Sequence, residues 1–146
     1  MWRATRLRGC IGTFDATDDV VATTSAMTRA SLDDRRFVKA PVTLEELRDI
    51  TIEISILSEA TATKRPMSLV PGTHGVIVRR RGRSGCFLPK VCSERGWSAE
   101  EFLSNCCTMK ADLPADAWRK PDTSVWLFTA QVFSENQLAK NATGEQ

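Results

Sequence analysis

The chain has 146 residues, a formal net charge of +2 and a pI of about 8.3, which suits one domain with a single core. A charge this close to balance does not by itself indicate a nucleic-acid or membrane partner. No run of about 18 apolar residues occurs, and no apolar segment follows the basic N-terminus. The sequence therefore predicts neither a membrane span nor a signal peptide, and we expect a cytoplasmic protein.

The apolar stretch 7–14 is interrupted by Gly9 and Gly12, which predicts a strand that enters a tight turn. Acidic residues then precede apolar residues at helical spacing, so a helix is expected over residues 19–33. Thr43 and Glu46 form a capping box, which predicts a short helix that ends near Asp49.

Alternating isoleucines predict a half-buried strand over residues 51–56. Prolines and a glycine indicate a loop over 59–74. Residues 75–78 and 86–88 then form a predicted hairpin, with its turn at 82–85 and arginines near its tip.

Pro89 and Gly96 are expected to bound a short helix, and the capping box of Ser98 and Glu101 predicts a second one. The prolines of residues 111–123 indicate a loop, and the apolar run 125–133 a central strand. We therefore expect an α+β fold, mainly an antiparallel sheet flanked by helices.

The chain resembles the AMMECR domain family, also called AmmeMemoRadiSam system protein A. The resemblance is carried by motifs in a fixed order: L-R-G-C-I-G-T-F at 7–14, D-R-R-F at 34–37, E-E-L at 45–47, I-E-I-S-I-L-S at 52–58, G-T-H-G-V at 72–76, F-L-P-K-V at 87–91, G-W at 96–97, E-F-L at 101–103, K-A at 110–111 and L-P at 113–114. Proline is common in the family where Arg35 stands, and Val38 begins a looser version of its F-P-P segment.

The resemblance implies a two-lobed single domain over residues 1–135, followed by a polar tail at 136–146. It implies Memo-type and radical-SAM partners, but no known reaction or cofactor. The family usually carries a helix and a strand before the signature, and we expect this chain to lack them. An open sheet edge there would favour a homodimer.

Cys10 is the main candidate for chemistry, because it lies between two glycines in this signature and a backbone of this kind allows close approach of a ligand. Arg8 is near in sequence, and a neighbouring cation favours the thiolate form of a cysteine. The alternative is a small buried side chain in a turn. Gly9 and Gly12 complete the predicted ligand-binding loop.

His74, the single histidine, is the candidate base for a Cys10 nucleophile. It could instead organise a loop through backbone hydrogen bonds. Asp34 and Arg36 are expected either to pair with each other or to hold an anionic ligand. The five cysteines are odd in number and lack a C-x-x-C motif, so we expect reduced thiols and no metal site.

The arginine-rich hairpin admits two interpretations. One is a phosphate-binding patch, and the other a solvated tip that protects the strand ends. The sequence thus favours an accessory or ligand-binding protein of unknown mechanism. A cysteine-dependent enzyme using Cys10 and His74 is the first alternative, and a nucleic-acid-binding regulatory factor is the second.

Overall fold

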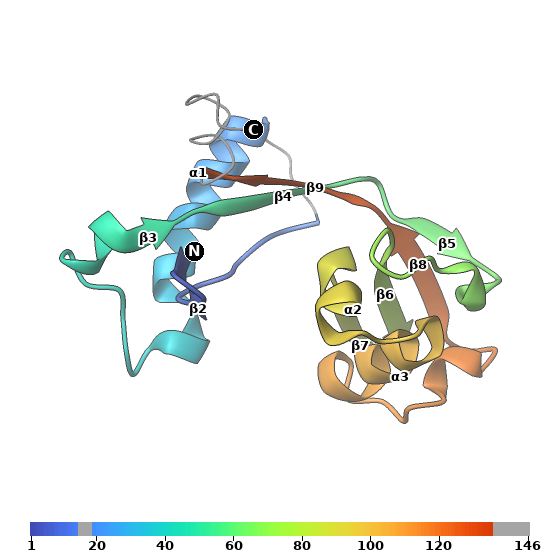
Figure 1. Ribbon diagram of the computed structural model, residues 1–146. Helices are drawn as coiled ribbons and strands as arrows, with labels where there is room; N and C mark the ends of the chain where they lie inside the picture. The colour runs from blue at the N-terminus through green and yellow to red at the C-terminus, as the bar shows by residue number, and fades with distance from the viewer. Residues whose placement is uncertain (15–18, 136–146) are drawn as a thin grey trace. The chain divides into compact units, whose positions relative to one another are not determined.

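A computed structural model describes residues 1–14 and 19–135 (Figure 1). The predicted tail at 136–146 lies outside them. The chain divides into two compact units, here called unit 1 (Met1–Ser55 and Val132–Gln146) and unit 2 (Ile56–Gln131). The boundary falls within β4 (Glu53–Leu57) and β9 (Ala130–Ser134), which pair as a two-stranded sheet. No helix among the described residues is long and apolar enough to cross a membrane.

Unit 1 contains a small antiparallel sheet in the order β2-β1-β3. Its strands are β1 (Trp2–Arg3), β2 (Arg6–Leu7) and β3 (Ile50–Thr51). The helix α1 (Val20–Ala30) begins where predicted, since the Asp19 side chain accepts a hydrogen bond from the Ala22 amide at 2.8 Å. The 3-10 turns of unit 1 are η1 (Ser31–Asp33), η2 (Arg35–Phe37) and η3 (Glu46–Asp49).

Unit 2 is built on an antiparallel sheet in the order β5-β8-β6-β7. Its strands are β5 (Thr61–Thr63), β6 (Gly75–Arg80), β7 (Arg83–Phe87) and β8 (Ser124–Phe128). The helix α3 (Ala99–Lys110) packs on β6 and β7, and α2 (Pro89–Arg95) on β6 (Figure 1). Two 3-10 turns, η4 (Pro66–Ser68) and η5 (Ala117–Arg119), complete it. The hydrophobic core lies here, with Val76, Val78, Phe102 and Leu103 fully buried.

These elements confirm the α+β fold. Several details differ from the sequence predictions. The predicted strand over residues 51–56 is divided at Ile52 into β3 and β4, which belong to different sheets. The first strand is confined to Arg6–Leu7, and the predicted loop 59–74 contains β5. The hairpin turn lies at Arg81 and Gly82, both with positive φ. The predicted strand 125–133 is interrupted at Thr129, whose amide donates to the Ser58 hydroxyl at 2.9 Å.

Candidate functional site

The Cys10 loop follows β2 in unit 1. Cys10 is exposed, and its amide donates to Asp34 Oδ2 at 3.0 Å. The carbonyl of Cys10 accepts from Arg36 Nη2 at 2.8 Å. Both polar groups of this residue's backbone are therefore held by the pair of side chains that the sequence analysis had singled out. We call Cys10, Asp34 and Arg36 the cysteine clamp.

Asp34 is the centre of the clamp. It is only 4% exposed and accepts from Arg36 Nε at 3.0 Å, from Nη2 at 2.6 Å and from the Arg36 amide at 3.1 Å. The hydrogen-bonded Arg36 side chain holds the pKa of Asp34 far below its usual range, against the opposing effect of burial. The predicted ion pair is therefore confirmed.

Arg36 also faces the thiol. Its pKa is raised, first by the hydrogen bond from its guanidinium to Asp34 and, with smaller effect, by the charge and hydrogen bonding of the Cys10 side chain. The cation beside Cys10 is thus Arg36.

Arg8 has a different environment from the one its sequence position suggested. Its Nη2 donates to Glu46 Oε2 at 2.8 Å and to the Pro41 carbonyl at 3.1 Å. The hydrogen bond from Arg8 lowers the pKa of Glu46. Nε and Nη1 of Arg8 are buried and have no partner among the described residues. Glu46 is a site residue that the sequence analysis missed, although its capping box with Thr43 forms as predicted.

Gly9 and Gly12 play different parts in the loop. A Cβ on Gly9 would lie 2.1 Å from the Ser31 carbonyl oxygen, whereas a Cβ on Gly12 would meet nothing within 4 Å. Gly9 is therefore required for close packing of the loop against η1. Whether either glycine also approaches a ligand stays a prediction.

His74 belongs to unit 2, so its predicted pairing with Cys10 in unit 1 stays a prediction. Its Nδ1 accepts from the Val70 amide at 2.9 Å, and a neutral ring with this bond carries its proton on Nε2. The ring lines a pocket of about 380 Å³ together with Ser58, Glu59 and other polar residues. In this tautomer Nε2 is a hydrogen-bond donor, and only Nδ1 can accept a proton. The ring can therefore act as a base only if the hydrogen bond from the Val70 amide to Nδ1 is broken.

Three of the remaining four cysteines belong to the hydrophobic core. Cys92, Cys106 and Cys107 are buried and Cys86 is half-buried. Burial raises the pKa of each of these thiols, that of Cys86 to about 11. No group of three metal-binding side chains occurs within residues 1–14 and 19–135.

These environments predict selective alkylation. At about pH 8 a thiol with the pKa of Cys86 is roughly one part in a thousand thiolate, and the fully buried thiols are also shielded from reagent. We expect iodoacetamide to add once per native chain, at Cys10, and five times after denaturation, as read by peptide mass spectrometry. Equal labelling of Cys86 and Cys10 in the native protein would contradict these assignments.

The fold is that of an α+β protein of two units. Its exposed cysteine lies on a loop whose backbone is hydrogen-bonded by the Asp34 and Arg36 side chains. The AMMECR1 family profile matches residues 1–133, and the chain belongs to this family. A protein from Thermococcus gammatolerans is 43% identical over 135 residues, which cover 88% of this chain and 64% of that protein. Protein PF1979 from Pyrococcus furiosus is 42% identical over 135 residues, covering 88% and 63%.

The crystal structure of the uncharacterised protein PH0010 from Pyrococcus horikoshii is similar, with a TM-score of 0.82 and 40% identity. The match covers 90% of this chain and 66% of that chain. The chain thus spans somewhat less than two thirds of the length of the two relatives above.

Proposed function

We propose that this protein is an accessory, ligand-binding component of an AmmeMemoRadiSam system, acting in the cytoplasm beside Memo-type and radical-SAM proteins. Arg8 carries the proposal. Its side chain is 4% exposed, yet two of its nitrogens donate to no described residue. A buried donor without an acceptor costs about 1–3 kcal/mol, so an acceptor oxygen supplied by a ligand or partner would be bound favourably at Arg8, next to Glu46.

The charges in unit 1 favour binding over proton transfer. Asp34 and Glu46 both have lowered pKa values, because Arg36 and Arg8 respectively hydrogen-bond their charged forms. Carboxylates of this kind are weak bases near neutral pH. The single histidine of the sequence lies in unit 2. The guanidinium groups are suited to hold a carboxylate or phosphate.

The test uses the purified Memo-type and radical-SAM proteins encoded in the same genome, mixed with this chain under reducing, anaerobic conditions. We expect association by analytical ultracentrifugation with at least one of them. Arg8→Gln, which removes the buried donors, is expected to weaken it about tenfold or more, and so is Arg36→Gln, because each substitution removes a charged donor. Arg35→Gln is the matched control, since this neighbouring arginine is exposed and forms no ion pair with a described residue.

Thermal unfolding of each variant shows whether the chain remains folded after the substitution. Failure of the wild-type chain to associate with either protein would contradict the accessory role. An equal loss in Arg35→Gln would show that general charge, and not the clamp, mediates the association.

The second candidate is a cysteine-dependent enzyme with Cys10 as nucleophile and His74 as base. The exposed thiol and the adjacent Arg36 guanidinium favour it. If Cys10→Ser abolished a turnover while association and folding stayed intact, this candidate would replace the first. The third alternative, nucleic-acid binding, depends on the arginine hairpin of unit 2.

A further inference from the structure

The β6–β7 hairpin presents four arginines at one end of the sheet in unit 2. Arg81 and Gly82 have φ values of 50° and 78°, as a two-residue hairpin turn with positive φ at both positions requires. Arg80 and Arg83 are paired across the strands, and Arg79 lies between Ser84 and Ser124 in register. A short, hydrogen-bonded hairpin therefore fixes the backbone positions of all four arginines.

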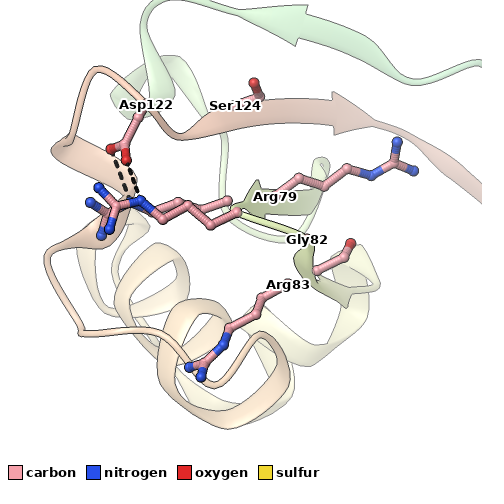
Figure 2. Close-up of a pocket in the computed structure, with 8 residues that line it drawn as sticks. Arg79, Gly82, Arg83, Asp122 and Ser124 are labelled. Atoms are coloured by element: carbon pink, nitrogen blue, oxygen red, sulfur yellow. Dashed lines mark hydrogen bonds and ion pairs between the residues drawn. The ribbon is translucent and has the colours of Figure 1, made fainter.

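Asp122 holds two of these groups side by side. Its Oδ1 accepts from Arg80 Nε and its Oδ2 from Arg81 Nε, both at 2.9 Å (Figure 2). The bonds lower the pKa of Asp122, with Arg80 as the larger cause. Because each arginine uses only its Nε, the terminal Nη groups of both remain available among the described residues. One carboxylate thus orients two guanidinium forks.

The pocket keeps a positive charge after its internal pairs are counted. Four arginines and Asp122 line a space of about 510 Å³, which gives the lining four positive charges and one negative. Asp112, outside the lining, pairs with Arg83 at 3.1 Å. The guanidinium of Arg79 lies 5.1 Å from the Trp126 ring centroid and has no carboxylate partner among the described residues. Two positive charges remain at the hairpin end, but Figure 2 shows the Arg79 side chain directed away from Asp122, so the pair of Arg80 and Arg81 is the part that can bind one anion.

We propose that this end of the hairpin binds the phosphate group of a small molecule, either inorganic phosphate or a phosphomonoester. Paired guanidinium forks match the tetrahedral oxygens of such a group. The volume is in the range of small-molecule sites.

The arrangement is poorly suited to a nucleic-acid backbone. A polyanion needs a positive track for successive phosphates, but here the arginines occupy a single hairpin end. Figure 2 shows Arg83 directed away from Asp122, and the Asp112 side chain beside Arg83 is 94% exposed. The exposed Asp112 carboxylate would repel a neighbouring phosphate, so one compact phosphate is favoured.

The full chain is titrated by isothermal calorimetry with inorganic phosphate, with glycerol phosphate as the phosphomonoester, and with a short DNA duplex, all at constant ionic strength. We expect saturable binding of at least one phosphate compound. Arg81→Gln should weaken it about tenfold. Arg95→Gln, which removes the same charge from an exposed residue of α2, should leave it unchanged.

The two small probes distinguish the sources, since preference for glycerol phosphate indicates an organic ligand and preference for phosphate the free ion. Arg81 is exposed, so this variant should fold, which circular dichroism checks. Absence of saturation with both small probes would overturn the proposal, as would an equal loss in Arg95→Gln. Tight duplex binding with no small-probe binding would overturn it in favour of nucleic acid.

Discussion

Gly9→Ala is expected to destabilise unit 1 by at least about 3 kcal/mol, the upper part of the range for overpacked sites. The added Cβ would lie 2.1 Å from the Ser31 carbonyl oxygen and 3.0 Å from the Ser31 carbonyl carbon. Both are backbone atoms, so no side-chain rotation can relieve the contact. The loop or η1 must move, and the hydrogen bond from the Cys10 amide to Asp34 would be lost. Urea unfolding measures the free energy, and hydrogen exchange of the Cys10 amide measures the local loss.

Gly12→Ala is the matched control within the same signature. Nothing lies within 4 Å of its Cβ, and its φ is not positive. We expect its free energy of unfolding to stay within about 0.5 kcal/mol of the wild type, as for ordinary surface substitutions. If both variants were destabilised equally, close packing of Gly9 would not explain the requirement for glycine.

The parts of the fold that the sequence predicted are those whose determinants lie close together in the chain. The capping boxes at Thr43 and Ser98 join residues three positions apart, and both form. Gly96 ends α2 in the left-handed conformation because a helix end of this type favours glycine. The strand β5 was missed because Thr61–Thr63 has no apolar alternation. Its pairing with β8 determines its conformation.

The same distinction applies to the candidate site. Asp34 and Arg36 are two residues apart, and their pairing was expected. The partner of Arg8 is Glu46, which lies 38 positions along the chain, and the partner of Arg80 is Asp122, 42 positions away. Local spacing contains no signal for such pairs. Sequence proximity alone indicated Arg8 as the cation beside Cys10, whereas the fold brings Arg36 there.

Asp34→Ala is expected to cost about 3 kcal/mol of stability and to release the Cys10 loop. The carboxylate accepts from two amides and from two nitrogens of Arg36, and hydrogen bonds to a charged group contribute about 1.5–3 kcal/mol each. The Arg36 side chain is 54% exposed, so water replaces part of its lost contact and the full sum is not expected. Urea unfolding provides the measurement. Asp33→Ala is the control, because this adjacent carboxylate is exposed.

The pH dependence of the unfolding free energy distinguishes the contribution of the Asp34 charge from that of its side-chain shape. Because its folded-state pKa is lowered, the stabilisation is complete above the unfolded value of about 4 and decreases as the pH falls below it. Asp34→Asn keeps the size of the side chain but cannot ionise. The difference in unfolding free energy between wild type and Asp34→Asn should therefore be constant from about pH 7 to pH 5 and shrink below about pH 4. A difference that did not change with pH would mean that the clamp depends on shape, and that ionised Asp34 does not hold the Cys10 loop in place.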